Sequence, residues 1–167
     1  VKAKEEVALY QWAKESGLLM SSKEFTIRWE AQGKKGETEN EVYYDPEEHA
    51  WFKRNNMIYH VTYLEFFQRI HLHNELFPEA PLEFLGFVVR DKKLWPVCKQ
   101  QHIEATRGAT HEEVKAHMEK IGFKQIPGTT TDYVNDHGIR VEDLHDENVL
   151  ISPDGDMYVV DPVIYVD

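Results

Sequence analysis

The spacing of apolar residues predicts both helices and strands in the first half of the chain. The segment Lys2–Ser16 places apolar side chains among charged ones, and Gly17 stands where a residue that ends a helix is expected, so we predict a helix. In residues 25–29, apolar side chains alternate with polar ones, which indicates a strand. Two further strands are predicted at Val42–Tyr44 and Trp51–Arg54, on either side of a turn. We expect these three strands to form a small antiparallel sheet.

Two capping-box signatures mark the later helices. Thr62 with Glu65 opens a helix that should end near Glu75, and Thr110 with Glu113 opens another. Further strands are predicted at Glu83–Val89, at Leu94–Cys98, around Tyr133 and at Ile139–Val141. Strands come first, one helix interrupts them, and more strands and a helix follow. This order predicts the α+β class rather than a parallel βαβ sheet.

Composition narrows the class of protein. A chain of 167 residues that is 41% hydrophobic can bury one core, so we expect a single domain over residues 1–167. With 19 basic and 30 acidic residues the formal charge is −11, which argues against nucleic-acid binding. The single cysteine, Cys98, excludes an internal disulfide and fits a reducing compartment. No stretch is long and apolar enough to span a membrane, so we expect a cytoplasmic protein. Because the chain begins with Val1 instead of Met, we expect it to be a piece of a longer protein.

The last quarter of the chain carries three side chains that suit a hard cation. Asp143, Asn148 and Asp161 offer carboxylate and amide oxygens, the ligands that Mg²⁺ prefers. Asp154 and Gly155 join two short apolar runs, which is a strong hairpin signal. If these two residues form the centre of the turn, Asn148 and Asp161 face each other, with Cβ atoms about 4.5–5.5 Å apart. The sequence therefore predicts a shared metal site on a hairpin.

The order of these features resembles a protein-kinase-like fold. Asp143 and Asn148 resemble the ends of the kinase catalytic loop, and Asp161 stands where the metal-binding Asp follows the next hairpin. The run Asp-Leu-His-x-x-Asn-Val-Leu is closer to the aminoglycoside-phosphotransferase-like kinases than to eukaryotic protein kinases. Over roughly residues 25–167 the chain resembles the minimal kinase-like domains of bacterial polyvalent proteins, which are multidomain proteins of phages and conjugative elements. Three segments carry this more specific resemblance: Glu41–Pro46, Phe52–Asn55 and His73–Phe77.

The resemblance implies a role for each residue of the acidic segment. Asp143 would be the catalytic Asp, which orients the attacking hydroxyl or accepts its proton. Asn148 and Asp161 would hold the Mg²⁺ that bridges the phosphates of ATP. His145 is predicted to support the loop through backbone hydrogen bonds, without a direct catalytic role.

The resemblance also implies nucleotide contacts upstream. Lys53 would contact the α- and β-phosphates, although Arg54 on the opposite sheet face remains an alternative. The segment Leu94–Gln101 would form the strand and hinge that meet the adenine, with Gln100 as a candidate contact. The loop Gly33–Gly36 occupies the place of a phosphate-covering glycine-rich loop.

The sequence offers several candidates for the acidic partner of Lys53. Glu65 lies on the helix from which such a partner usually comes, but a capping box accounts for Glu65 without any catalytic role. Three other glutamates compete with it: Glu39, Glu41 and Glu75.

Several departures bear on catalysis. Val141 stands where related motifs carry His, Pro162 follows Asp161 where protein kinases carry Phe-Gly, and the chain stops at Asp167, before a helical lobe. We therefore expect a kinase-like N-lobe over about residues 1–99, with an antiparallel sheet and one main helix, and a hinge and truncated C-lobe over about residues 100–167. One predicted function is ATP–Mg²⁺ binding with phosphoryl transfer to an unknown hydroxyl of a protein or small molecule. The other is a non-catalytic, pseudokinase-like binding module that works beside other domains of a mobile-element protein.

Overall fold

The computed structural model describes residues 1–32 and 39–166. The predicted glycine loop Gly33–Gly36 lies outside the described residues. Four helices are described: α1 (Lys2–Glu15), α2 (Ser22–Gln32), α3 (Tyr63–Leu76) and α4 (His111–Lys120). Together with antiparallel sheets they confirm the α+β class. Within the described part of the chain, none of the helices combines the length and apolar character needed to cross a membrane.

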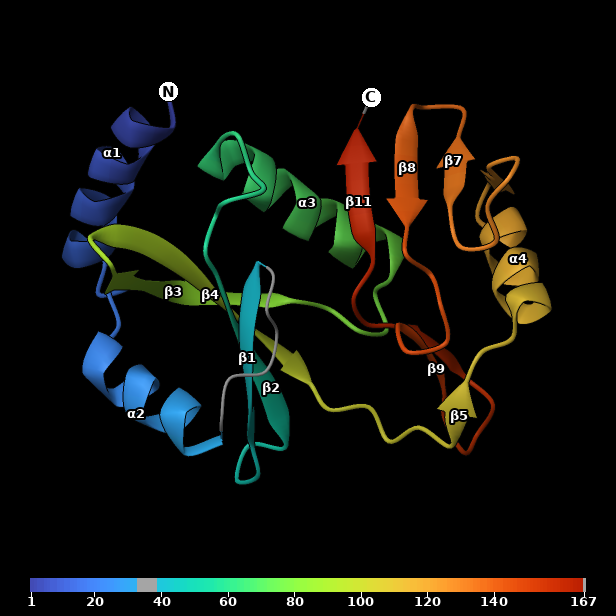
Figure 1. The fold of residues 1–167 in the computed structure, drawn as a ribbon, viewed down its shortest axis with the longest axis horizontal. Helices are drawn as coiled ribbons and strands as arrows, with labels where there is room; N and C mark the ends of the chain where they lie inside the picture. The colour runs from blue at the N-terminus through green and yellow to red at the C-terminus, as the bar shows by residue number, and fades with distance from the viewer. Residues whose placement is uncertain (33–38, 167) are drawn as a thin grey trace. The chain divides into compact units, whose positions relative to one another are not determined.

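The chain forms two compact units, and the first consists of Val1–Ile70 and Leu82–His102. Its centre is a four-stranded antiparallel sheet in the order β1-β2-β4-β3 (Figure 1). The strands are β1 (Asn40–Asp45), β2 (Ala50–Asn55), β3 (Glu83–Arg90) and β4 (Lys93–Gln101). Between β3 and β4, Asp91 and Lys92 form a two-residue turn, and both have positive φ, at 51° and 60°, as a type I′ turn requires.

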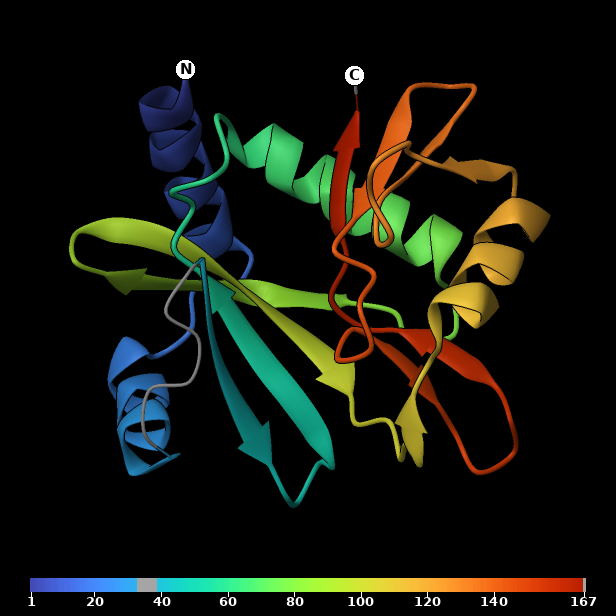
Figure 2. The same ribbon diagram turned by 45° about the vertical axis from the view of Figure 1, so that its right-hand side comes forward.

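The sheet of the first unit buries apolar side chains on both faces. On one face, Phe52 and Val97 pack with Phe25 of α2. On the other face, Cys98 packs with Ala13 of α1 and Phe66 of α3. The alternation along a strand explains the division, because neighbouring residues point to opposite faces. Figure 2 shows α1 and α2 beside this sheet in a second view.

The strand predicted over residues 25–29 is wrong, since these residues belong to α2. Phe25 is buried, but Ile27 is 57% exposed, so the apparent alternation did not reflect one buried face. The sequence contained the correct signal just upstream, where Ser21 precedes Glu24 by three residues. The Ser21 hydroxyl accepts a hydrogen bond from the Glu24 backbone N–H at 3.5 Å, a weak form of a helix N-cap.

The second unit consists of His71–Pro81 and Ile103–Asp167 and contains two small antiparallel sheets. One sheet has the order β10-β9-β5 and the other β11-β8-β7-β6. Their strands are β5 (Arg107–Gly108), β6 (Phe123–Gln125), β7 (Tyr133–Asn135), β8 (Ile139–Glu142), β9 (Val149–Ile151), β10 (Met157–Val159) and β11 (Val163–Val166). The core of this unit includes Val141, Leu144 and Val149, each with 0% of its surface exposed.

Helix α4 begins at the second predicted capping box. The Thr110 hydroxyl accepts the Glu113 backbone N–H at 3.2 Å, and the Glu113 carboxylate accepts the Thr110 N–H at 3.0 Å. Both bonds satisfy backbone donors that a helix start otherwise leaves without partners. Val114 and Met118 of α4 then face the core of the second unit.

Candidate functional site

The C-terminal hairpin predicted from Asp154 and Gly155 exists, but its register differs by one residue from the prediction. Val159 pairs with Val149, and the Val160 N–H donates to the Asn148 carbonyl at 2.9 Å. Asn148 therefore lies opposite Val160, and the predicted direct pairing of Asn148 with Asp161 is wrong. Asp161 follows one position later and is exposed.

The turn explains this shift in register. The Ser152 N–H donates to the Asp156 carbonyl at 2.9 Å, so three residues (Pro153, Asp154 and Gly155) connect the strands instead of two. The Gly155 N–H returns to the Ser152 carbonyl at 2.9 Å, and Gly155 has a φ of 86°. A type I turn followed by a left-handed glycine is the usual three-residue hairpin loop. The extra loop residue moves the facing position from Asp161 to Val160.

Asp143 and Asn148 are joined directly within one loop. The Asn148 side-chain Nδ2 donates to the Asp143 carbonyl oxygen at 2.8 Å and lies 3.3 Å from the Asp143 carboxylate Oδ2. An amide has two donor hydrogens on nitrogen and an acceptor oxygen. Because the nitrogen faces Asp143, the Asn148 oxygen is the atom that can serve a cation.

The backbone of Asp143 has a conformation that few side chains adopt. Its φ is 68°, in the left-handed region where Asp and Asn are the most tolerated residues other than glycine. The Asp143 N–H donates to Asp132 Oδ1 at 3.2 Å, and the next N–H, of Leu144, donates to the Thr131 carbonyl at 3.0 Å. Leu144 is fully buried, whereas 54% of the Asp143 side chain is exposed. The loop is thus anchored in the core while its carboxylate reaches solvent.

His145 completes this loop, as predicted, through backbone and side-chain contacts. Its Nδ1 accepts the Glu147 backbone N–H at 3.2 Å, so in the neutral ring the proton resides on Nε2. That Nε2 lies 3.4 Å from Asp143 Oδ1 and 3.1 Å from Asn148 Nδ2. An Nε2–H can donate to the carboxylate but not to the amide nitrogen, so His145 supports the position of Asp143.

Gly108 is a residue of this site that sequence reasoning missed. It belongs to β5, which pairs with β9. A Cβ at this position would lie 2.3 Å from the carbonyl oxygen of Asp146 and 2.7 Å from its Cβ. Only glycine allows the loop to approach β5 this closely. The two-residue strand β5 is too short to give a strand pattern, so the sequence contains no signal for this contact.

Lys53 and Arg54 lie on opposite faces of β2, and the structure distinguishes them. Arg54 is 1% exposed and ion-paired with Glu41, which gives it a structural role. Burial lowers the pKa of Arg54, and Glu41 opposes that shift. Lys53 lies opposite Cys98 in the sheet, on the face that packs against α1 and α3. Of the two cations, Lys53 is therefore the better candidate for a phosphate contact.

Gln100 is in direct contact with Lys53. The Lys53 ammonium donates to the Gln100 side-chain oxygen at 2.8 Å, and Gln100 is 3% exposed. Cys98 pairs with Lys53 across the sheet and precedes Gln100 by two residues. Burial raises the pKa of the Cys98 thiol to about 12, and the positive charge of Lys53 partly opposes this shift. A thiol with such a pKa is protonated at neutral pH and is not a nucleophile. The structure thus brings Lys53 and Gln100 together, and the nucleotide contact of each remains a prediction.

Glu65 has both carboxylate oxygens in use elsewhere. One accepts from Arg69 on the next turn of α3, and the other accepts the Val61 backbone N–H at 3.0 Å. The Thr62 hydroxyl accepts the Glu65 N–H at 3.0 Å, as in a capping box. These contacts match the capping role of Glu65, and its role beside the nucleotide remains a prediction.

Two of the other candidate glutamates also have defined partners. Glu41 pairs with Arg54 and Arg90, and Glu39 lies 3.5 Å from His60. The hydrogen bond from His60 lowers the pKa of Glu39.

The donor set at the end of the β9–β10 hairpin fits a hard cation. The Asn148 amide oxygen and the exposed Asp161 carboxylate are both oxygen donors, and neither sulfur nor imidazole is needed for Mg²⁺. Asn148 and Asp161 would be the residues that hold Mg²⁺, and the ion would neutralise phosphate charge in a protein whose net charge is −11.

Sequence comparisons identify the family. Searches among curated proteins gave no match, and searches among solved structures gave none either. A family model described as the serine/threonine/tyrosine kinase found in polyvalent proteins matches residues 2–167. The match covers nearly the whole chain, including Lys53, Asp143, Asn148 and Asp161. The chain therefore belongs to this family of kinases found in polyvalent proteins.

Proposed function

We propose that this domain binds ATP with Mg²⁺ and transfers the γ-phosphoryl group to a hydroxyl of a protein or small-molecule acceptor. The acceptor oxygen would form a bond to the γ-phosphorus as the bond to the ADP oxygen breaks, and the hydroxyl proton would pass to the Asp143 carboxylate. Mg²⁺ held by Asn148 and Asp161 would stabilise charge on the phosphates. Lys53 would contribute positive charge at the α- and β-phosphates.

The observation that carries the proposal is the conformation of the Asp143 loop. Asp143 has a left-handed φ of 68° and an exposed carboxylate, and the next residue, Leu144, is buried in the core. The Asn148 Nδ2 donates a hydrogen bond to the Asp143 carbonyl oxygen at 2.8 Å. Strained backbone that surrounding bonds hold in place is a feature of functional sites. Because the hydrogen bond to the Asp143 carbonyl uses the Asn148 nitrogen, the Asn148 oxygen faces away from Asp143 and is available to bind a metal ion.

The Lys53–Gln100 contact supports nucleotide binding in the first unit. The Lys53 ammonium donates to the Gln100 side-chain oxygen at 2.8 Å, and an ammonium group brings positive charge to a bound phosphate. Lys53 therefore suits an anionic ligand.

The test has two measurements on the wild type and on Asp143→Asn. Thermal shift with ATP, with and without MgCl₂, reports binding, and release of ADP reports turnover. We expect a magnesium-dependent shift in both proteins and loss of turnover in Asp143→Asn by about 10²–10⁴-fold, the usual contribution of a catalytic acid or base. Asp154→Asn, an exposed carboxylate in the hairpin turn, is the matched control and should keep wild-type turnover.

The second candidate function is a non-catalytic, pseudokinase-like module within a longer protein. Val141 favours it, because this buried core residue occupies the position where related catalytic motifs carry His. A magnesium-dependent ATP shift in the wild type without any turnover would select this function. No thermal shift with ATP in the presence of any divalent cation would contradict both candidates.

A further inference from the structure

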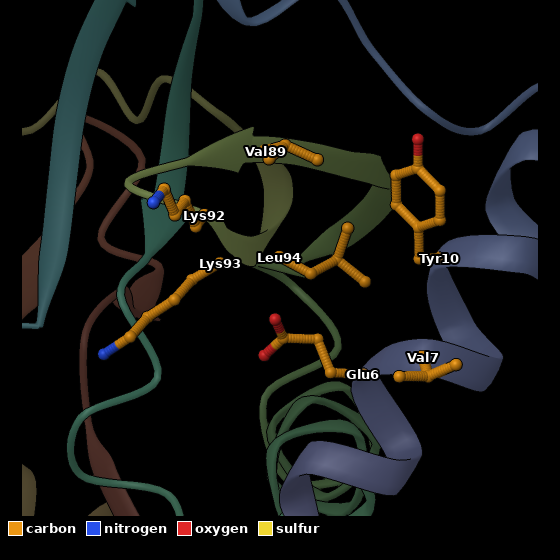
Figure 3. Close-up of a pocket in the computed structure, with 7 residues that line it drawn as sticks. All are labelled: Glu6, Val7, Tyr10, Val89, Lys92, Lys93 and Leu94. Carbon is orange, nitrogen blue, oxygen red and sulfur yellow. The ribbon is translucent and has the colours of Figure 1, made fainter.

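A groove lies in the first unit between α1 and the β3–β4 hairpin, and it plays no part in the proposed function. Its volume is about 240 Å³. Figure 3 shows Glu6, Val7 and Tyr10 of α1 on one side. The hairpin lines the other side with Val89, Lys92, Lys93 and Leu94. We call these seven residues the α1 groove.

Several apolar side chains of the α1 groove are exposed to solvent, although such side chains usually favour burial. Val7 is 73% exposed, Tyr10 41% and Val89 36%, whereas Leu94 beneath them is 2% exposed. Single exposed apolar side chains are common, but here three gather around one concavity. An apolar group placed among them would cover apolar surface that the described part of the chain leaves in water, and removing such surface from water favours binding.

Two lysines give one end of the α1 groove a positive charge. Lys92 and Lys93 are exposed, and their side chains extend from the hairpin turn, away from Val7 and Tyr10 (Figure 3). Among the described residues neither lysine forms an ion pair. A local positive charge on a protein with a net charge of −11 is an exception, and it favours an acidic ligand at this end.

Glu6 adds a hydrogen-bond acceptor between these two parts. The Tyr63 hydroxyl lies 3.0 Å from Glu6 Oε2 and 2.6 Å from the Leu94 carbonyl oxygen. A hydroxyl has one proton, and the shorter distance favours the Leu94 carbonyl as its acceptor. The Glu6 carboxylate therefore keeps the capacity to accept an N–H from a ligand.

We propose that the α1 groove binds an extended peptide segment of another domain or protein, with one apolar side chain next to acidic residues. The apolar side chain would contact Val7, Tyr10 and Val89, the acidic residues would pair with Lys92 and Lys93, and a backbone N–H would reach Glu6. The volume favours this occupant, since pockets for small molecules measure about 300–1,000 Å³ and this one suits a single side chain with its flanking backbone.

A selection from displayed random 12-residue peptides tests the proposal on the complete chain. Enriched peptides are synthesised with a fluorescent label, and fluorescence anisotropy gives their Kd. We expect enriched peptides to combine Asp or Glu with a neighbouring Leu, Ile, Phe or Met. We expect Lys92→Glu/Lys93→Glu and Val7→Asp each to raise the Kd at least tenfold, and added NaCl to weaken binding to the wild type.

Matched variants separate the groove from the overall charge. Lys23→Glu/Lys124→Glu makes the same change in charge at exposed lysines elsewhere, and Ala8→Asp places a carboxylate on the exposed side of α1 beside Val7. Both should bind the selected peptides as the wild type does, and circular dichroism checks that all variants fold. Enrichment of no peptide, enrichment without acidic residues, or equal affinity for Lys92→Glu/Lys93→Glu would overturn the proposal. ATP binding is measured separately and does not affect this outcome.

Discussion

Two polar clusters of this protein use charged side chains in opposite ways. In the first unit, Glu41 pairs with Arg54 and Arg90, and both guanidinium groups lie over the Trp95 ring, at 5.6 and 5.1 Å from its centroid. In the second unit, Asp143 stands on a loop whose buried residue is the apolar Leu144.

The difference lies in which part of each residue is buried. The charge of Arg54 is buried and compensated, so the arginine serves packing and stability. The charge of Asp143 is exposed, and the loop instead fixes its backbone. A charge that interacts with a ligand has to be accessible to that ligand, and the Asp143 carboxylate is 54% exposed. The following changes test this contrast, from the largest expected effect on stability to the smallest.

Removing the charge of Glu41 should have the largest effect. Glu41→Gln leaves Arg54 buried beside Arg90 without the carboxylate that both share. We expect the free energy of unfolding to fall by about 3 kcal/mol, because a buried charge then loses its compensation. Urea denaturation measures it, and Glu47→Gln at an exposed position of the β1–β2 turn is the control. A loss as small as that of the control would show that the cluster is not structural.

Adding a methyl group at Gly108 should disturb the Asp143 loop. Gly108→Ala places its Cβ against the backbone of Asp146, so either β5 or the loop must move. We expect a loss of about 1–3 kcal/mol in the free energy of unfolding, as for other overpacked positions. Gly122→Ala is the control in the same unit, because its Cβ would meet no atom within 4 Å although its φ of 91° adds strain. Because Gly108 has no positive φ, a loss below about 0.5 kcal/mol for Gly108→Ala would mean that crowding at Asp146 has no effect.

The turn glycine should have a smaller effect. Gly155 has a φ of 86° with open space around it, so Gly155→Ala introduces backbone strain without a clash. We expect a loss of about 1–2 kcal/mol in the free energy of unfolding. Gly155→Asn should recover part of this loss, since Asn tolerates the left-handed region better than Ala. If Asn and Ala destabilise the protein equally, the φ of Gly155 does not determine the stability of this turn.

Asp143→Asn should have the smallest effect on stability, despite its large expected effect on turnover. Asn also tolerates a positive φ, and the exposed carboxylate has no buried environment to lose. We expect the free energy of unfolding to change by less than about 0.5 kcal/mol, as for most surface substitutions. A loss comparable with that of Glu41→Gln would mean that Asp143 serves the fold, and the contrast between the two clusters would fail.

Much of the local structure follows from the sequence because the signals are local. The capping box of Thr110 and Glu113 starts α4 as predicted, and Gly17 follows the end of α1 with a φ of 71°. Each of these features depends on residues within a few positions of one another.

The misjudged features depend on choices that local patterns leave open. An Asp-Gly pair fits both a two-residue and a three-residue turn, and the bond from the Ser152 N–H to the Asp156 carbonyl selects the longer one. Residues 25–29 fit either a strand or a helix by apolar spacing, and in the structure they belong to a helix that starts after Ser21 and packs Phe25 against the sheet.

The sequence by itself determined the α+β class, most element positions and the family to which the chain belongs, because these depend on local signals and on the motif around Asp143 and Asn148. The tertiary structure alone decided that Lys53 shares a sheet face with Cys98 while Arg54 is buried with Glu41. It also decided that Gly108 lies against the Asp143 loop. Sheet faces and close approaches depend on which distant segments pack together, and no local pattern contains that information.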